Sequence, residues 1–448
     1  MKFNIEPNWE VSDPQKIMNY AQAEYSRGNM PFAVIMCHAL TDMLPRFHDA
    51  WHLLGIVAWK KGMLRHAIRF FEQAALSDPN SVKTAEALAH VRSAFAQSSS
   101  DRQTLPWLGD REQPYYLLIK SWGFGFWADV THVLGQLLIC EITGRKPVTY
   151  WGRTCRYGDD TPKDHFVDFF APLSDTSIDD IETTGGTFFP KFWTSQNLRL
   201  EDANKFRRPA PRWRFAVDFL GRDTTIVVSD YVTDIAILRH WLDPAHPWSG
   251  LSSVEIHRRL AEKYLRPIVS LERRADQFCA EHLPGSNFIA VHVRGTDKVH
   301  EDSRVLSLQE RYPELINPWL SGDRSRKIFL MTDDTDVVSR YQNIYGDRIV
   351  LTQAYRTNGT VGVHFEDKRD GLMLGEEVLV DVLIARRARF FIGFGTSNVS
   401  CSVYYLKDWP QESVRWVVEP EHLTRYHWFL YMPPSLDKAL VRRTASPI

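Results

Sequence analysis

The sequence contains few cysteines, and they follow no pattern. Among its 448 residues there are five, far apart in the chain: Cys37, Cys140, Cys155, Cys279 and Cys401. No two of them form a Cys-x-x-Cys pair and their total is odd, which excludes a cysteine zinc site and a disulfide framework. We therefore expect a protein of a reducing compartment.

An excess of charge and long apolar stretches are also missing. The formal net charge is −1, which argues against a nucleic-acid partner. No apolar run reaches the roughly 18 residues of a membrane span, and the first residues lack the basic and apolar regions of a secretory signal. We expect a cytoplasmic protein with no transmembrane segment, and the length predicts two or three domains.

Residues 1–100 show a repeat. The spacing of a tetratricopeptide unit is matched by Trp51, Leu54, Gly55, Ala67, Phe71, Ala74 and Pro79. A weaker copy 34 residues earlier and a capping helix after it are marked by Tyr20, Ala33, Pro45, Leu88 and Val91. We predict an all-α repeat domain; a plain amphipathic bundle is the alternative. Since two repeats bury little surface alone, the domain should pack on the next domain or on a second copy of the chain.

Beyond a polar linker, apolar strands alternate with helices. Residues 252–283 are expected to form a long helical stretch, and strands are predicted at 115–120, 146–150, 224–230, 287–293, 327–332, 348–352, 390–394 and 414–418. This order is typical of parallel sheets with helices on both faces. We predict two doubly wound α/β domains, at 112–270 and 271–448. Ligands bind beyond the carboxyl ends of such strands.

Charged residues follow the strand at 287–293. His292 and Arg294 lie two apart, so both point to the same side of the sheet. The loop above the carboxyl edge of the strand then contains Asp297, Lys298, Glu301 and Asp302. An arginine at this place can hold an anion such as a diphosphate through two parallel hydrogen bonds. A salt bridge between Arg294 and Asp297 is the alternative.

Two more strands end in polar residues that should reach the same edge. Asp333 and Asp334 close the strand "FLMTDD". The strand "FIGF" is followed by Gly395, Thr396, Ser397 and Asn398. Such small and polar groups let a phosphate approach and donate hydrogen bonds to it.

Asp381 lies in a helix that is apolar around most of its circumference. A buried carboxylate there needs a partner. Guanine is one candidate, because its ring and exocyclic N–H groups form a paired donor edge that two carboxylate oxygens can accept. A salt bridge to Arg386 or Arg387, or exposure at the helix end, is the alternative.

These motifs resemble a known family. "VHVRGTDK", "FLMTDD" and "EEVLVDVLIARRARFFIGFGTSNVSCSVYYL" are similar, in this order, to the motifs of the α1,6-fucosyltransferases and nodulation fucosyltransferases. "GFGFWADVTHVLGQLLICEITGRKPV" matches more loosely, and the resemblance covers roughly residues 112–410. It implies a GT-B type fold of two Rossmann-like domains, the first on the acceptor side and the second binding the nucleotide sugar. It also implies inverting transfer of L-fucose from GDP-fucose to a glycan hydroxyl.

Site roles follow from the resemblance, position by position. Arg294 would hold the β-phosphate of GDP-fucose, His292 and Asp381 would contact the nucleoside, and Asp302 or Glu301 would be the catalytic base. The remaining donor-site residues would be Asp297, Lys298, Asp333, Asp334, Ser397, Asn398, Tyr312, and Gly123 and Gly125 through their backbone N–H groups. The sequence departs from the family at Gly295, where a second arginine is usual.

Metal dependence and the acceptor are open questions at this stage. Asp334 and Asp336 have an Asp-x-Asp spacing by which other transferases hold a divalent cation. Since Arg294 and Lys298 already supply positive charge, we expect a metal-independent site with no cofactor besides the donor substrate. Aromatic residues of the first α/β domain are candidates for an acceptor wall, with core packing as the alternative: Trp127, Trp151, Trp193 and Trp213.

Two other functions remain compatible with the sequence. One is a transferase of the same fold that uses another nucleotide sugar, such as UDP-N-acetylglucosamine. The other is a non-catalytic scaffold that works through its repeats. In the preferred interpretation, the protein is a bacterial enzyme at the inner membrane face that acts on a soluble or lipid-linked glycan. Its repeats would then bind a partner protein or a second copy of the chain.

Overall fold

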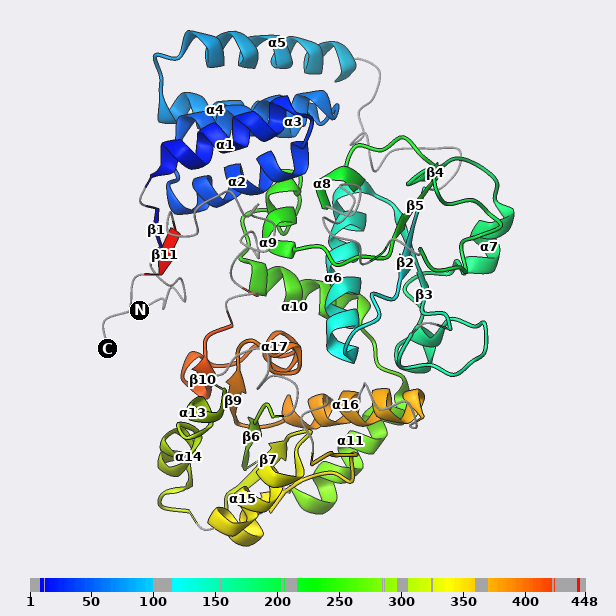
Figure 1. Cartoon of the computed structure of the whole chain (residues 1–448), viewed down its shortest axis with the longest axis vertical. Helices are drawn as coiled ribbons and strands as arrows, with labels where there is room; N and C mark the ends of the chain where they lie inside the picture. Colours follow the sequence, from blue (N-terminus) through cyan, green and yellow to red (C-terminus); the bar gives the residue numbers. More distant parts are fainter. Residues whose placement is uncertain are drawn as a thin grey trace.

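The computed structural model consists of three units (Figure 1). A helical unit is followed by two α/β units, each with its own parallel sheet, which confirms the predicted fold class of two α/β domains preceded by an all-α segment. The structure describes residues 9–11, 13–99, 115–153, 155–202, 205, 216–283, 285, 287–295, 305–323, 325–358, 370–420, 423 and 441–443.

Five helices form the N-terminal unit, and each packs against the next: α1 (Pro14–Ser26), α2 (Met30–Met43), α3 (His48–Lys60), α4 (Leu64–Ser77) and α5 (Val82–Ser99). Asp13 caps α1 by accepting from the Lys16 N–H at 2.9 Å. α3 begins 34 residues after α1, and α4 begins 34 residues after α2. The helices therefore recur with the period of the predicted repeat.

Gly55 allows α3 and α4 to approach each other closely. A Cβ atom at this position would lie 2.6 Å from the ring of Phe71. The ring is fully buried, so it has little freedom to move aside. The contact between Gly55 on α3 and Phe71 on α4 thus explains why the repeat pattern has a glycine at the first position and an aromatic residue at the second.

The helical unit rests on the first α/β unit through Trp241. This residue ends η3 (Arg239–Trp241), which follows α9 (Ile235–Leu238), and it is fully buried. Its indole N–H donates to Nε2 of His38 at 3.0 Å, and its carbonyl accepts from Nε2 of His66 at 2.8 Å. The repeats therefore pack on the next domain, as one of the two alternatives predicted.

The first α/β unit contains a four-stranded parallel sheet in the order β3-β2-β5-β4. Its strands are β2 (Tyr116–Lys120), β3 (Lys146–Tyr150), β4 (Phe188–Phe189) and β5 (Ile226–Ser229). The short β4 was not predicted, because two residues give no strand pattern. The helices of this unit, besides α9 and η3, are α6 (Phe126–Thr143), η1 (His165–Asp168), α7 (Ile178–Thr183), α8 (Ala216–Phe219) and α10 (Ser253–Tyr264).

The second α/β unit has a five-stranded parallel sheet in the order β10-β9-β6-β7-β8. The strands are β6 (Phe288–His292), β7 (Lys327–Met331), β8 (Ile349–Val350), β9 (Phe390–Phe394) and β10 (Val414–Val418). The other elements are α11 (Val269–His282), α13 (Val305–Gln309), α14 (Tyr312–Leu320), α15 (Thr335–Tyr345), η5 (Gly346–Arg348), α16 (Gly371–Ala385), α17 (Asn398–Tyr405) and η7 (Gln411–Ser413). Since the chain continues to one side of β6 and later returns to the other, the strand order reverses between β6 and β9.

Both faces of this sheet are covered by helices. Ile289 and Val291 of β6 belong to a core shared with α14 and α15, whereas Phe288 and Ala290 belong to the core that includes α11 and α16. Alternate residues of a strand point to opposite faces. The near-continuous apolar composition of β6 therefore reflects burial on both sides.

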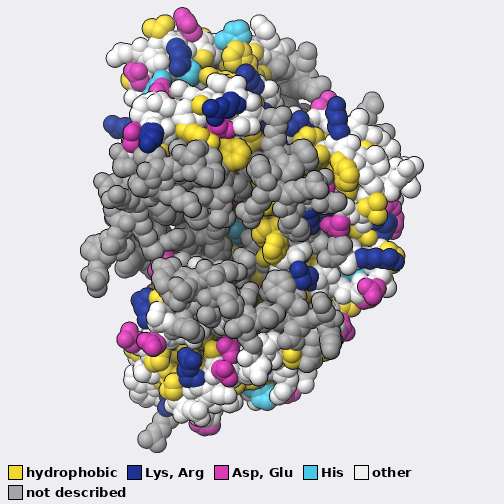
Figure 2. Space-filling view, in the orientation of Figure 1, with side chains coloured by type: hydrophobic (Ala, Val, Ile, Leu, Met, Phe, Trp, Pro, Cys, Tyr) yellow, Lys and Arg dark blue, Asp and Glu magenta, His cyan; other side chains and the backbone are white. Residues whose placement is uncertain are grey.

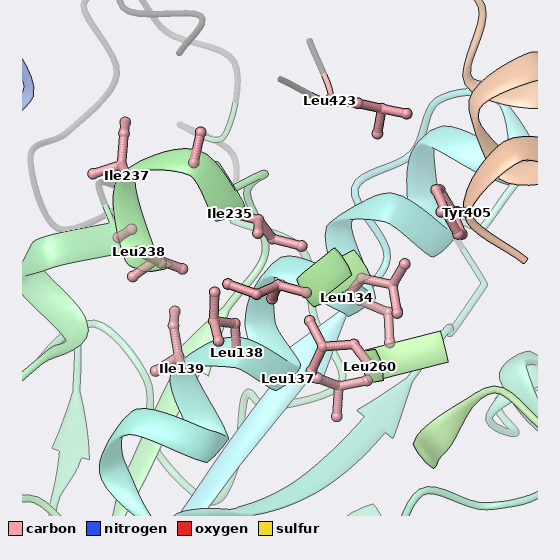
Figure 3. Close-up of a cluster of buried hydrophobic side chains, with 14 of the residues drawn as sticks. Leu134, Leu137, Leu138, Ile139, Ile235, Ile237, Leu238, Leu260, Tyr405 and Leu423 are labelled. Atoms are coloured by element: carbon pink, nitrogen blue, oxygen red, sulfur yellow. The ribbon is translucent and has the colours of Figure 1, made fainter. Parts of the chain in front are cut away.

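A shared apolar core joins the two α/β units (Figure 3). Tyr405 of α17, in the second unit, lies close to Leu134 of α6 and Leu260 of α10 in the first (Figure 3). The predicted long helix at 252–283 is interrupted between α10 and α11. Pro267 lies in this gap and favours such a break, because proline disfavours a helical conformation of the residue before it.

Two short strands, one near each end of the sequence, pair beside the helical unit (Figure 1). β1 (Trp9–Val11) pairs antiparallel with β11 (Val441–Arg443). The C-terminal strand therefore lies outside the second sheet, although the sequence placed all of residues 271–448 in one domain.

The surface is of mixed charge. On the face shown in Figure 2, the described Lys, Arg, Asp and Glu side chains are interspersed, in keeping with the net charge of −1. Within the described ranges, no helix is both long and apolar enough to cross a bilayer.

We expect Gly55→Ala to destabilise the helical unit by about 1–3 kcal/mol, because the added methyl group would overlap the buried Phe71 ring. Thermal unfolding followed by circular dichroism would show a lower Tm. In a chain that already contains Phe71→Leu, adding Gly55→Ala should lower the Tm by less than it does in the natural chain, because the smaller side chain leaves room for the methyl group. A Tm that is unchanged or higher, as helix propensity alone predicts for this exchange, would contradict the proposed contact.

Candidate active site

A cavity of about 380 Å³ lies at the carboxyl ends of β6, β7 and β9. This is the place where the strand order reverses, which is where α/β sheets bind ligands. One wall is charged and comes from the second unit, with His292, Arg294 and Asp381. The opposite wall comes from the loop before α6 and includes the aromatic rings of Trp122 and Phe124.

His292 ends β6 and lines the cavity. Its Nδ1 lies 2.6 Å from the hydroxyl of Ser400, which itself accepts from the Phe394 N–H at 2.9 Å. Since a hydroxyl can both donate and accept, the direction of the bond between Ser400 and Nδ1 depends on the tautomer of the ring. Burial, and then the charge of Arg294, lower the pKa of this histidine well below its usual value. The imidazole is thus neutral, and its bond to Ser400 holds the ring in place.

Arg294 is held in place by Asp333. Its Nη1 donates to Oδ2 of Asp333 at 2.8 Å, and both side chains are mostly buried. Its backbone carbonyl accepts from Nε2 of Gln309 at 2.8 Å. The alternative pairing of Arg294 with Asp297 concerns a residue outside the described ranges. A guanidinium fixed by a neighbouring carboxylate needs little reorganisation to bind an anion.

Asp334 supports the loop and does not line the cavity. Its carboxylate caps α15 by accepting from the Asp336 N–H at 2.8 Å, so a helix cap accounts for the Asp-x-Asp spacing. Asp334 also packs against Gly295, where an added Cβ would lie 2.7 Å from it. The arginine that the resembled family has at this position would therefore not fit without a shift of the loop.

Asp381 places a buried carboxylate in the charged wall. One oxygen accepts from the Thr352 hydroxyl at 2.7 Å. Burial raises its pKa from the usual 3.8 to about 6, although Thr352 and Arg356 lower it. Keeping it ionised at neutral pH costs roughly 3 kcal/mol. A stable fold does not require such a group at a cavity surface, which makes it a candidate for ligand binding.

The salt-bridge alternative for Asp381 is wrong. Arg387 donates to Glu272 at 2.9 Å and to Asp276 at 2.6 Å, and Arg386 also pairs with Glu272. Both arginines thus bind carboxylates of α11. Exposure at the helix end is excluded as well, because Asp381 is 7% exposed.

The N-terminus of α17 reaches the cavity. Thr396, Ser397 and Asn398 line it, and the Ser397 side chain makes no capping bond to its own helix. The first N–H groups of a helix and its dipole favour an anion at this end.

The glycine loop differs from the prediction. The N–H groups of Gly123 and Phe124 donate to the buried carboxylate of Asp129, at 3.0 and 3.3 Å to the same oxygen. They are therefore engaged inside the protein and do not face a phosphate. Of the two glycines predicted as donors, Gly125 lines the cavity. Burial raises the pKa of Asp129 to about 7, against the effect of these N–H groups.

Several predicted site residues lie elsewhere. Tyr312 is fully buried, and its hydroxyl donates to the His292 carbonyl at 2.6 Å, so it supports β6 from below. Of the predicted acceptor-wall residues, three are at most 4% exposed: Trp127, Trp151 and Trp193. For Trp151 and Trp193 the alternative of core packing is correct. Trp127 lines the cavity. The positions outside the described residues are Asp297, Lys298, Glu301, Asp302 and Trp213.

Other residues of the cavity were not predicted. Trp122 and Phe124 form the aromatic wall, with ring centroids 4.5 Å apart, and Phe124 is 38% exposed. They flank Gly123, so the aromatic–glycine loop was the available signal. Glu377 and Tyr355 line the charged wall; Glu377 lies in the motif that contains Asp381 but was not singled out, and no sequence motif marked Tyr355.

No protein-family model and no curated protein sequence matches the chain. Among solved structures, it is similar to the fucosyltransferase NodZ from Bradyrhizobium, with 18% identity, a TM-score of 0.43 and coverage of 65% of this chain and 92% of that chain. It is also similar to a variant of Arabidopsis thaliana FUT1 in complex with GDP (11% identity, TM-score 0.43, coverage 82% and 80%). A third is POFUT1 in complex with GDP (15% identity, TM-score 0.37, coverage 68% and 98%). At this level of similarity, the chemistry of the chain has to be derived from its own cavity.

Proposed function

We propose that the chain is a glycosyltransferase that transfers L-fucose from GDP-fucose to a hydroxyl of a glycan. The observation that carries the proposal is the placement of Asp381 and Arg294 in one cavity at the switch point of the second sheet. The carboxylate of Asp381 can accept hydrogen bonds from a nucleobase with two adjacent donors, and the guanidinium of Arg294 can bind a diphosphate.

Asp381 would select the base. Ionised, it can accept two parallel hydrogen bonds from N1–H and the amino group of guanine while keeping its bond to Thr352. Adenine presents a ring nitrogen with a lone pair beside its amino group, and uracil flanks its single N–H with two carbonyls. Both would place a lone pair against the carboxylate, which costs binding energy. Guanosine diphosphate is therefore the carrier that this wall favours.

Arg294 and the start of α17 would hold the diphosphate. The Arg294–Asp333 pair fixes one cation, and Ser397 and Asn398 add donors at the helix N-terminus. Negative charge grows on the leaving diphosphate as the bond from the anomeric carbon to its oxygen breaks. Donors arranged in advance around that charge lower the barrier. His292 would contribute its Nε2 atom from the same wall.

The acceptor would enter along the aromatic wall. Its hydroxyl oxygen would form the new bond to the anomeric carbon from the side opposite the diphosphate, and its proton would pass to a carboxylate, which gives inversion. Asp302 or Glu301 is proposed for this role. The acceptor is proposed to be a soluble or lipid-linked glycan, and the repeats are proposed to bind a protein partner or a second copy of the chain.

We expect Asp381→Asn to reverse the base preference. The amide keeps one acceptor and gains a donor, which matches xanthine and no longer matches guanine. Calorimetric titration should show GDP binding to the natural chain and weakened by about 10-fold or more in the variant, with xanthosine diphosphate gaining affinity. Preferential binding of UDP by the natural chain would instead identify a different nucleotide-sugar transferase.

Arg294→Lys should lower the hydrolysis of GDP-fucose by about 100-fold or more, because a lysine cannot reproduce the fork that faces the diphosphate. Slow donor hydrolysis, measured as released GDP, needs no knowledge of the acceptor. Arg326→Lys, a change in the same domain away from the cavity, is the matched control and should leave the rate near that of the natural chain. Unchanged hydrolysis in Arg294→Lys would contradict the role given to Arg294, whereas no release of GDP by the natural chain would argue for a scaffold function.

Hydrolysis should also survive excess EDTA, since protein cations and donors are assigned to the charge of the diphosphate. The measurement is the rate of GDP release before and after chelation, with Mn²⁺ added back in a separate sample. A rate that falls with EDTA and returns with Mn²⁺ would contradict the metal-independent mechanism.

A further inference from the structure

The loop at 351–358, which follows β8, forms part of the charged wall. It is tied to α16 at two points: the Thr352 hydroxyl donates to Oδ1 of Asp381 at 2.7 Å, and the Tyr355 N–H donates to Oε2 of Glu377 at 2.9 Å. Its end is tied to the end of β7, where the Thr357 N–H donates to a backbone carbonyl at 3.0 Å. The loop therefore keeps a defined position beside Asp381.

Arg356 lies within this loop, and only part of its guanidinium is hydrogen-bonded. Nη1 donates to the carbonyls of Thr352 at 3.0 Å and Ala354 at 2.6 Å. Nε and Nη2 are buried, and neither has a hydrogen-bond partner among the residues described. A buried guanidinium with unused donors is costly, so its retention at this place calls for an explanation other than the two backbone bonds.

The charges around Arg356 belong to the cavity. After the effect of burial, which lowers its pKa, the strongest opposing influence is the charge of Asp381, followed by Glu377 and Asp333. All three carboxylates line the cavity. Among the carboxylates that act on Arg356, Asp381 is therefore the strongest.

How Arg356 interacts with Asp381 matters for ligand binding. A close ion pair would occupy the oxygens of the carboxylate, and within the described ranges Arg356 makes no such pair. The two backbone carbonyls hold the guanidinium in place, so that it acts on Asp381 through its field. The carboxylate keeps its charge, and its lone pairs remain available for a ligand.

We propose that Arg356 is a positioning residue for nucleotide recognition: fixed by the carbonyls of its own loop, it keeps Asp381 ionised without using up the acceptor oxygens that read the base. This inference rests on the proposed function, because it concerns the binding of a guanine nucleotide. It assigns Arg356 no contact with the substrate.

Other charged and titratable groups also face Asp381. Glu377, one turn earlier on α16, raises its pKa, and Arg274 of α11 lowers it. Arg274 is itself paired with Glu376 at 2.7 Å. In the same charged wall, His292 ends β6, Arg294 follows it, and Asp333 follows β7. Arg356 has the largest lowering effect among these charged groups, so its removal should be the most visible.

The test is the pH dependence of GDP-fucose binding, measured by calorimetric titration between pH 5 and 8.5. The diphosphate of this ligand is esterified at both ends, so it does not titrate in the range. For the natural chain, affinity should be constant above pH 7 and fall as the pH drops through about 6, where Asp381 becomes protonated. In Arg356→Met the midpoint should move upward by about one pH unit or more, with affinity recovered at pH 8.5.

Three further variants separate charge from structure. Arg356→Lys retains the charge and should keep the midpoint near that of the natural chain. Thr352→Val removes a hydrogen bond to the ionised form and should shift the midpoint in the same direction as Arg356→Met. It also serves as the second test if Arg356→Met does not fold. Arg348→Met, which removes an arginine that donates to the Leu320 carbonyl, is the matched control and should leave the profile unchanged.

The outcomes are distinct. If Arg356→Met weakens binding equally at every pH, or leaves the profile unchanged, Arg356 only braces the loop and the inference is wrong while the proposed function stands. In the Asp381→Asn background, Arg356→Met should have no pH-dependent effect, and a remaining shift would also overturn the inference. If the natural chain does not bind GDP-fucose at all, the proposed function fails first, and this inference fails with it.

Discussion

The parallel order of β6, β7 and β9 is the constraint on which the cavity depends. These strands lie far apart in the sequence, yet each ends in polar residues, and parallel strands end at the same edge. His292 and Arg294 after β6 therefore meet Asp333 after β7. Because the strand order reverses between β6 and β9, the helices on either side diverge there and leave room for a ligand.

The buried charges of Arg294 and Asp381 are each bound by a polar neighbour. Asp333 fixes Arg294 through one nitrogen of the guanidinium, and Thr352 binds one oxygen of Asp381. In the glycine loop, Asp129 accepts hydrogen bonds from two backbone N–H groups, so these groups do not bind a ligand and the loop is held in place. That rigidity holds Trp122 and Phe124 in place, so an aromatic wall faces a charged one. A reaction between a charged donor and a sugar ring suits this division, because sugar rings pack on aromatic faces.

The helical repeats stand apart from this chemistry. Among the residues described, none from the helical unit lines the cavity, and Figure 1 shows the unit at the opposite end of the molecule from the second sheet. Its contact with the first α/β unit uses the buried Trp241 and two neutral histidines. The pairing of β1 with β11 brings the C-terminal strand to the same side. The helical unit thus belongs to the body of the protein through specific contacts.

The sequence by itself determined the element types, the repeat period and most of the charged edge, because strand alternation, helix spacing and polar strand ends are local patterns. It identified Arg294 and Asp381, since each is a charged residue in an apolar setting. Tertiary structure alone decided which aromatic residues face the cavity: Trp151 and Trp193 are core residues, whereas Phe124 is exposed. It also decided that the charge of Arg356 acts on Asp381, because the loop after β8 that contains Arg356 docks onto α16. Such contacts depend on how distant segments pack, and no short sequence window contains that information.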